Sequence, residues 1–261
     1  MSYTTLTYEV QDHVGVVTFN RPDAANAMGP EMAAELNAVA REIDSDPDVR
    51  AVVITGAGKM FCAGGDLGAF AAAGEGARSL LLQMTGDLHV GLSRLARTNA
   101  PVIAAVNGTA AGAGFSLVMF CDLAVSAESA VYTMAYTRAG LSPDGSSTYF
   151  MPRKIGDRRA RELMLTNRVL SAQEALDWGV VNDVVPDDQL MDTAMKLARS
   201  LASGPTQAFG QVKTLLNGTF DQSLESQMEL EARAIADMIT TADGQEGVSA
   251  FLDKRKPDFK G

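Results

Sequence analysis

Two glycine-rich stretches constrain the fold of this 261-residue chain more than any other feature of its sequence. Phe61–Leu67 reads Phe-Cys-Ala-Gly-Gly-Asp-Leu, and Gly108–Gly114 reads Gly-Thr-Ala-Ala-Gly-Ala-Gly. Each directly follows an apolar run typical of a β-strand, at residues 51–55 and 102–106, and each leads into a predicted helix. Glycine lets a ligand approach bare backbone N–H groups, and a helix start adds the positive end of a dipole. Two such corners can direct two N–H donors at one oxygen, as in the oxyanion hole of acyl chemistry.

Composition and charge exclude several classes of protein. The hydrophobic fraction of 46% and the charged fraction of 21% are typical of one large globular domain, here of the α/β class. A net charge of -10 argues against a nucleic-acid partner, because binding phosphates requires an excess of lysine and arginine. The sequence contains no basic segment leading into an apolar run and no membrane-length apolar stretch. We therefore expect a cytoplasmic protein with no membrane partner.

The cysteines and histidines show no metal-binding pattern. Cys62 and Cys121 are too few for a disulfide framework and belong to no metal-spaced cluster. His13 and His89 lie far apart and lack the i, i+4 spacing of a helical zinc site. We expect neither a structural nor a catalytic metal.

Strand and helix patterns alternate through most of the chain. A hairpin is predicted over residues 6–20, and apolar residues at helical spacing predict a helix over 29–43 and a longer one over 78–97. Further short strands are predicted at residues 122–126 and 131–134. The pattern becomes mostly helical beyond about residue 158. This order predicts an α/β core over residues 1–200 and a helical region over residues 201–261.

Nucleotide-binding motifs explain the glycines poorly. Gly112-Ala113-Gly114-Phe115-Ser116-Leu117 has leucine where a dinucleotide fingerprint requires its third glycine. Gly58-Lys59 is followed by Met60, where a phosphate-binding loop requires serine or threonine. Each stretch by itself is also typical of a tight structural turn, whereas two of them after successive strands favour a functional site.

Three further segments extend the pattern toward the C-terminus: Leu141–Gly145 (Leu-Ser-Pro-Asp-Gly), Ser171–Gly179 and Glu246–Phe251. Together with the glycine stretches they resemble the crotonase superfamily, the enoyl-CoA hydratase/isomerase family, over nearly the whole chain. The resemblance implies a spiral of ββα units and a C-terminal helical trimerisation region, with trimers often paired into hexamers. It also implies an acyl-coenzyme A substrate, with coenzyme A as part of that substrate and no separate cofactor.

The resemblance assigns the backbone groups of the site. The two oxyanion-hole amides fall on Gly65 and Ala113, where they would bind the thioester carbonyl oxygen, and Ala63 matches a backbone position that meets the adenine. The remaining predicted substrate-binding residues of the two stretches are Gly64, Asp66, Leu67, Gly112 and Gly114.

The residues that would carry the chemistry differ from those of the family's hydratases. The two glutamates that position water there correspond to Ser116 and Tyr136, and neither can act as a carboxylate base. Asp144, taken alone, is typical of a turn or a helix N-cap. In the resemblance its loop faces the acyl group, and single-aspartate isomerases such as the epoxyphenylacetyl-CoA isomerases carry an aspartate there. A lone carboxylate beside an apolar pocket suits a 1,3-proton shift, so we expect an enoyl-CoA isomerase with Asp144 as its acid and base.

Three alternatives remain open at this stage. A hydratase would use Asp144 and another group. A 4-chlorobenzoyl-CoA dehalogenase would use Asp144 as a nucleophile, with His89 at the matching helix position but Tyr136 in place of that subgroup's tryptophan. A non-catalytic acyl-CoA-binding scaffold would explain the absent glutamates. We expect His89, Ser116 and Tyr136 to shape or polarise the substrate pocket, although a histidine in a helix is also typical of an ordinary surface or packing position.

Overall fold

A six-stranded sheet forms the base of the molecule. The computed structural model describes residues 3–261, and none of the helices in this span has the length and apolar character that crossing a bilayer requires. Strand β1 (Leu6–Gln11) pairs antiparallel with β2 (Val14–Phe19), which confirms the predicted hairpin. Parallel pairing then continues through β3 (Ala51–Gly56), β5 (Val102–Val106), β7 (Leu123–Ala127) and β10 (Asp183–Val185).

A second, smaller sheet turns the chain into a spiral. Its strands are β4 (Met60–Cys62), β6 (Thr109–Ala111), β8 (Val131–Thr133) and β9 (Leu170–Ser171), in that order. The chain passes from the large sheet to the small sheet and then into helical structure three times: β3–β4–α2/α3, β5–β6–α4 and β7–β8–α5. The helices of these repeats are α2 (Leu67–Ala72), α3 (Ala77–Leu95), α4 (Ala113–Phe120) and α5 (Ser147–Ile155). This confirms the α/β core that the sequence pattern predicts and the spiral of ββα units that the family resemblance implies.

The small sheet corrects one part of the sequence prediction. Neither glycine-rich stretch leads straight from a large-sheet strand into a helix, because β4 and β6 lie within the two stretches. These strands are Met-Phe-Cys and Thr-Ala-Ala, and three residues are too few to show a two-residue periodicity. They are stabilised by pairing with each other, and a non-local pairing leaves no signal in a local pattern.

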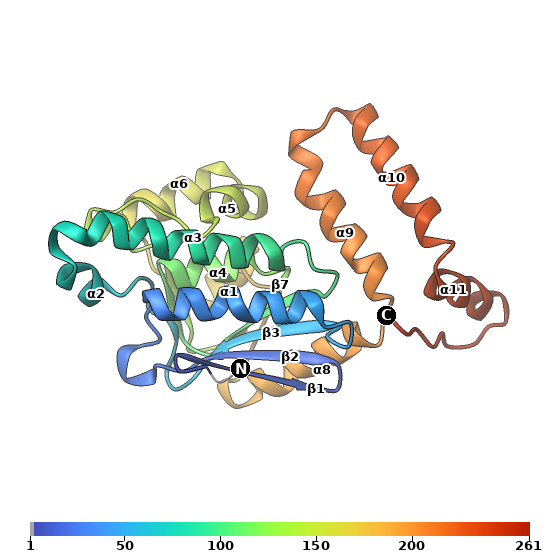
Figure 1. Cartoon of the computed structure of the whole chain (residues 1–261), viewed down its shortest axis with the longest axis horizontal. Helices are drawn as coiled ribbons and strands as arrows, with labels where there is room; N and C mark the ends of the chain where they lie inside the picture. Colours follow the sequence, from blue (N-terminus) through green and yellow to red (C-terminus); the bar gives the residue numbers. More distant parts are fainter. Residues whose placement is uncertain (1–2) are drawn as a thin grey trace.

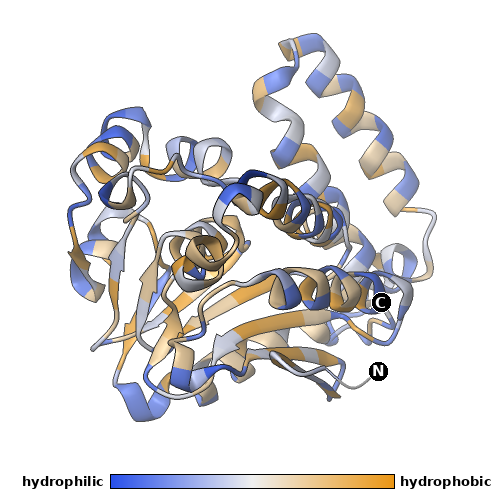
Figure 2. Ribbon diagram, turned by 60° about the vertical axis from the view of Figure 1, so that its left-hand side comes forward, coloured by the Kyte–Doolittle hydropathy of each residue, from blue (hydrophilic) through white to orange (hydrophobic). Residues whose placement is uncertain are grey.

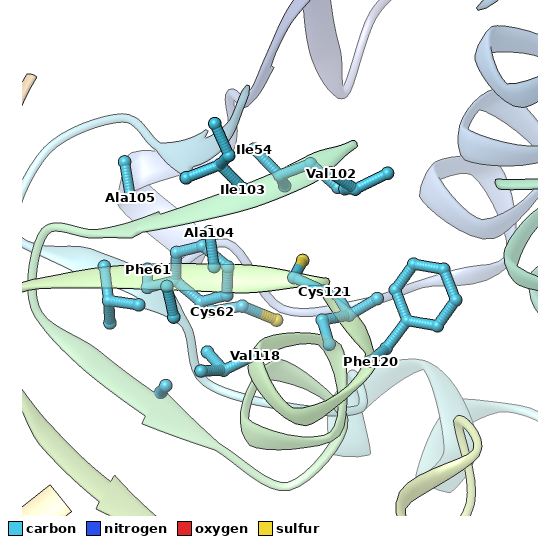
Figure 3. Close-up of a cluster of buried hydrophobic side chains, with 14 of the residues drawn as sticks. Ile54, Phe61, Cys62, Val102, Ile103, Ala104, Ala105, Val118, Phe120 and Cys121 are labelled. Atoms are coloured by element: carbon cyan, nitrogen blue, oxygen red, sulfur yellow. The ribbon is translucent and has the colours of Figure 1, made fainter. Parts of the chain in front are cut away.

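The core lies around the parallel strands. Helix α1 (Pro30–Ser45) packs against α3, and α8 (Leu190–Ala202) packs against β2, β3, β5 and β7 (Figure 1). All five residues of β5 are buried, and Figure 3 shows Phe61 and Cys62 among the apolar side chains near this strand. Burial raises the pKa of the Cys62 thiol to about 11 and that of Cys121 to about 12. Both thiols therefore stay protonated at neutral pH, as packing residues do.

The C-terminal helices extend away from this core (Figure 1). After α6 (Asp157–Thr166) and α7 (Ala172–Trp178), the chain passes through α8 into α9 (Thr206–Gly218), α10 (Leu224–Met238) and α11 (Ala242–Leu252). Hydrophobic residues alternate with hydrophilic ones along the projecting helices (Figure 2). The exposed large apolar side chains from α9 to α11 are Val212, Leu216, Phe220, Leu224, Met228, Leu230, Ile235, Ile239, Val248, Phe251 and Leu252.

A buried lysine, paired with a partly exposed aspartate, fastens α9 to the core. Lys213 is 7% exposed, and its Nζ lies 3.0 Å from Asp122 Oδ2. The same ammonium group donates hydrogen bonds to the carbonyl oxygens of Leu95 and Ala100, at 3.0 and 2.9 Å. Asp122 in turn accepts a hydrogen bond from the Val102 N–H, at the start of β5. The end of α3, the start of β5 and α9 thus meet at one cation.

We expect Lys213→Met to lower the free energy of unfolding by about 2 kcal/mol, because it leaves two carbonyl oxygens without their donor and removes the cation beside the partly exposed Asp122. Urea denaturation of the two proteins measures the difference. Lys196→Met is the matched control, because Lys196 is an exposed lysine on α8, and its effect should stay within about 0.5 kcal/mol. Equal unfolding midpoints for the two variants would show that the ion pair contributes nothing to the attachment of α9.

Candidate active site

The pairing of β4 with β6 brings the two glycine corners into direct contact. Met60 lies opposite Thr109, and Cys62 lies opposite Ala110. Beyond these pairs, Gly64 has a φ of 101° and Gly112 a φ of 49°, both in the region that favours glycine. A Cβ atom on Gly64 would lie 3.0 Å from the Ala111 carbonyl oxygen, and one on Gly112 would lie 3.5 Å from the Gly64 Cα. The close approach of the two corners therefore depends on glycine at position 64.

Gly114 holds the start of α4 against β4. A Cβ atom at this position would lie 2.2 Å from the Cys62 carbonyl oxygen and 2.8 Å from the Cys62 Cβ. Both groups belong to a buried strand that cannot yield easily. The first turn of α4 is therefore fixed next to the first glycine corner.

We expect Gly114→Ala to destabilise the fold by about 1–3 kcal/mol, because the added methyl group overpacks the contact with β4. The same displacement should move Ala113 away from Gly65 and lower the affinity for acyl-CoA. Urea denaturation and isothermal titration calorimetry measure the two effects. Gly86→Ala serves as the control, because a Cβ atom there meets nothing within 4 Å and alanine favours the α3 helix. A Gly114→Ala protein as stable as Gly86→Ala would contradict the packing constraint.

Two backbone N–H groups at the corners remain free. Gly112 donates its N–H to the Thr133 carbonyl, and the first bond inside α4 runs from the Ser116 N–H to the Gly112 carbonyl. The N–H of Ala113, the first residue of α4, therefore has no acceptor within residues 3–261. At the other corner, Met28 bonds to the residues on either side of Gly65, and the described chain likewise offers the Gly65 N–H no acceptor.

The two residues that carry these free N–H groups, Gly65 and Ala113, line one cavity of about 330 Å³. Its walls come from the two glycine corners, from α2 and α3, and from the segment between β8 and α5. The lining residues are Ala63, Gly64, Gly65, Leu67, Phe70, Arg78, Leu81, Leu82, Met84, Thr85, Leu88, Gly112, Ala113, Ala135, Tyr136, Ala139, Leu141, Ser142 and Asp144. Asp144 is the only carboxylate among them, and most of the other side chains are apolar. We call this space the acyl cavity, after the acyl group that the family resemblance implies for it.

No sequence motif predicts the wall that α3 contributes to the acyl cavity. Arg78, Leu81, Thr85 and Leu88 face the cavity from successive turns of this helix. Their spacing of three and four residues is the signal of one helix face, but it does not distinguish a pocket wall from a core contact. Arg78 adds a cation to the wall, and its position in the sequence carries no functional pattern.

The side chain of Asp144 caps no helix. Helix α5 starts after Ser146, without a side-chain cap. The Asp144 backbone carbonyl accepts the bonds that form the turn, from the N–H and the hydroxyl of Ser147 at 3.2 and 2.9 Å. The carboxylate instead accepts a 2.7 Å hydrogen bond from the Tyr136 hydroxyl at Oδ1, and its Oδ2 lies 3.8 Å from His89 Nε2. The carboxylate is thus oriented by tertiary contacts at the cavity wall.

Ser116 and Tyr136 form one hydrogen-bonded group with this aspartate. Ser116 on α4 is fully buried, and its Oγ lies 2.9 Å from the Tyr136 hydroxyl oxygen. Burial, followed by the nearby charge of Asp144, raises the pKa of Tyr136 above its usual range. Tyr136 therefore remains a protonated donor, and it fixes one of the two carboxylate oxygens of Asp144.

Ser116, predicted from the sequence to shape the pocket, and the remaining predicted site residues lie outside the lining of the acyl cavity. Asp66 caps α2 by accepting the Ala69 N–H, and it pairs with Arg21 at 3.1 Å. These two contacts, the Ala69 N–H and the Arg21 guanidinium, keep the pKa of Asp66 below its usual value. Gly114 packs against β4, and His89 lines a second cavity on the far side of Asp144.

The spiral of ββα units defines the class of fold, and comparison with known proteins defines the family. The enoyl-CoA hydratase/isomerase family model matches residues 9–261. The chain is 40% identical to 1,2-epoxyphenylacetyl-CoA isomerase of Escherichia coli, over 97% of each chain. It is 38% identical to a probable enoyl-CoA hydratase of Rhodobacter capsulatus, over the full length of both. A crystal structure of an enoyl-CoA hydratase from Polaromonas sp. JS666 superposes with a TM-score of 0.93 at 34% identity, covering 98% of this chain and 99% of that one. The chain belongs to the enoyl-CoA hydratase/isomerase family and has the crotonase fold.

Proposed function

We propose that this family member is an acyl-CoA isomerase that moves a double bond within an enoyl-CoA thioester. The observation that carries the proposal is the single carboxylate of the acyl cavity, Asp144. The two positions that resemble the hydratase glutamates hold Ser116 and Tyr136, which are bonded into the Asp144 group. One acid/base group suits a reaction in which a proton leaves one carbon and a proton returns to another.

The geometry supports a division of roles among these groups. The free N–H groups of Gly65 and Ala113 would bind the thioester oxygen and stabilise the negative charge that develops there. Asp144 Oδ2 would take the proton from the carbon next to the carbonyl, because Oδ1 is held by Tyr136. The same carboxyl group would then deliver a proton at the far end of the conjugated system. Coenzyme A takes part as the carrier of the acyl group, and the scheme uses no further cofactor.

The direct test mixes the purified protein with a 3-enoyl-CoA and follows conjugation with the thioester by ultraviolet absorbance. The expected result is conversion to the 2-enoyl-CoA without net addition of water. The proposal fails if the protein binds acyl-CoA but converts no 3-enoyl-CoA over a panel of linear, branched and aromatic acyl groups. Such binding without turnover would favour a scaffold role, and halide release from 4-chlorobenzoyl-CoA would favour a dehalogenase.

Hydration of a 2-enoyl-CoA is the second candidate activity. Several relatives carry hydratase names, including proteins of Rhodobacter capsulatus and Rhizobium meliloti. His89 Nε2, 3.8 Å from Asp144 Oδ2, supplies a second group able to exchange a proton. Formation of a 3-hydroxyacyl-CoA from the 2-enoyl-CoA, at a rate above that of isomerisation, would favour this activity.

We also propose that the apolar surface of α9–α11 is covered by further copies of this chain, as the family resemblance implies for trimers and hexamers. Phe251 is 82% exposed and Ile235 is 73% exposed, far more than isolated monomers usually leave in one region. Light scattering should give a multiple of the 27.5 kDa chain mass, and Ile235→Glu with Phe251→Glu should reduce it toward one chain. Leu165→Glu on α6 is the control, because this residue is 71% exposed but lies outside the C-terminal helices. A monomeric parent protein would contradict the proposal.

A further inference from the structure

Asp144 stands in the wall between two cavities. The acyl cavity lies on one side, and a second cavity of about 810 Å³ lies on the other, between α3, α5 and the end of α9. Within the described chain, Asp144 alone lines both cavities. His89 lines the second cavity and takes no part in the acyl cavity. The second cavity therefore reaches the carboxylate from the side that an acyl group does not occupy.

The two oxygens of the carboxylate face different partners. Oδ1 accepts the hydrogen bond of Tyr136, whose hydroxyl belongs to the wall of the acyl cavity. Oδ2 lies 3.8 Å from Nε2 of His89, a distance that a small side-chain movement or one water molecule bridges. The side chain of Asp144 is 26% exposed and that of His89 is 49% exposed. An acyl group in the acyl cavity leaves the second cavity, which His89 lines, as the other space that Asp144 borders.

A backbone contact indicates the neutral tautomer of His89. The Gly145 N–H lies 3.3 Å from His89 Nε2, and an N–H donor requires a lone pair on that nitrogen. The imidazole proton is therefore on Nδ1, and Nε2 is the basic atom. Nε2 is also the ring nitrogen that lies near Asp144 Oδ2. Because Nε2 has one lone pair, it takes a proton from protonated Asp144 only after a small ring movement that exchanges the 3.3 Å contact with Gly145 for the nearby Oδ2.

We propose that His89 exchanges the proton carried by Asp144 with water in the second cavity during turnover. This inference rests on the proposed isomerase function. The C–H bond next to the carbonyl breaks, its proton goes to Asp144 Oδ2, and its electron pair enters the enolate. The Nε2 lone pair of His89 turns from the Gly145 N–H to Oδ2, the proton passes from Oδ2 to Nε2, and the Nδ1 proton leaves to water. The reverse transfer brings a solvent proton back to Oδ2, and that proton forms the new C–H bond. His89 acts through Asp144 and does not touch the substrate.

The experiment measures deuterium in the product. A 3-enoyl-CoA is isomerised in D₂O to low conversion, and mass spectrometry gives the deuterium per molecule in both the product and the remaining substrate. His89→Gln is the test variant, because its amide oxygen can accept the Gly145 N–H while the side chain carries no exchangeable acid/base proton. We expect most wild-type product to contain deuterium, and the deuterium incorporated per isomerisation to fall about tenfold or more in His89→Gln.

Two further measurements separate proton exchange from a merely structural effect. Added imidazole should restore deuterium incorporation in His89→Gln, because a diffusible base can enter the second cavity. Ser93→Ala alters the same cavity wall on α3 without removing an acid/base group, so its deuterium ratio should match the wild type. Wild-type product without deuterium, or an unchanged ratio in His89→Gln, would overturn the role of His89.

We call the proton exchange between Asp144, His89 and water the relay. Failure of the relay and failure of the isomerase function give different results. If isomerisation requires Asp144 but His89→Gln does not change the deuterium content, the isomerase function stands and the relay is overturned. If the substrate's α-hydrogen exchanges in a way that depends on His89 but no isomer forms, the result supports the relay and rejects the isomerase function. Absence of both reactions rejects both.

Discussion

Asp144→Asn is expected to lower kcat/KM for the isomerisation of a 3-enoyl-CoA by about 10²–10⁴-fold, the usual range for loss of a general acid/base group. Asparagine has nearly the same shape as aspartate, and its amide oxygen can still accept the Tyr136 hydroxyl. It cannot take a proton from carbon at neutral pH. The change therefore removes the proposed chemistry while the surrounding hydrogen bonds keep their partners.

Steady-state kinetics with the 3-enoyl-CoA measure the loss, and calorimetric titration with free coenzyme A tests whether the binding site is intact. Asp188→Asn is the matched control, because it makes the same substitution at an exposed carboxylate on the connection before α8. Its activity should equal that of the parent protein. An Asp144→Asn enzyme that retains full isomerase activity would show that this carboxylate does not move the proton.

The glycine corners could be predicted from the sequence because their cause is local. A strand, a glycine-rich turn and a helix leave a pattern within about fifteen residues, and the positive φ values of Gly64 and Gly112 require that residue type. Pairing of β4 with β6 could not be predicted, because it joins segments about fifty residues apart through strands of three residues each. The resemblance to a family supplied the missing long-range information by implying that both corners meet at one substrate oxygen.

The surroundings of Asp144 show why local sequence left two interpretations open. Ser-Pro-Asp-Gly before a helix suits a structural turn or cap as well as a carboxylate that faces the acyl group, and the same residues precede α5 in either case. The structure distinguishes them through Tyr136 and His89, which come from a 3₁₀ turn and from α3. Neither residue shares a helix with Asp144, so no helical spacing in the sequence links either of them to this carboxylate. The orientation of a carboxylate by distant partners is a property of the packed fold.

Ala113→Pro is expected to lower kcat/KM by about 10²–10³-fold, because it removes one of the two N–H groups proposed to stabilise the enolate oxygen. Any other substitution at this position keeps the backbone N–H, whereas proline removes it. Ala113 is the first residue of α4, the helix position at which proline is best accommodated. The preceding residue is Gly112, which has no Cβ atom to clash with the proline ring. The fold should therefore tolerate the change.

Ala113→Ser is the control, because it changes the side chain at the same position and keeps the N–H. Its kcat/KM should stay close to that of the parent protein, while Ala113→Pro loses turnover and retains binding of free coenzyme A, which has no thioester oxygen. A similar loss in both variants would point to crowding of the cavity by any larger side chain. Retention of activity in Ala113→Pro would mean that the Gly65 N–H and the α4 dipole suffice, and that the second donor is not needed.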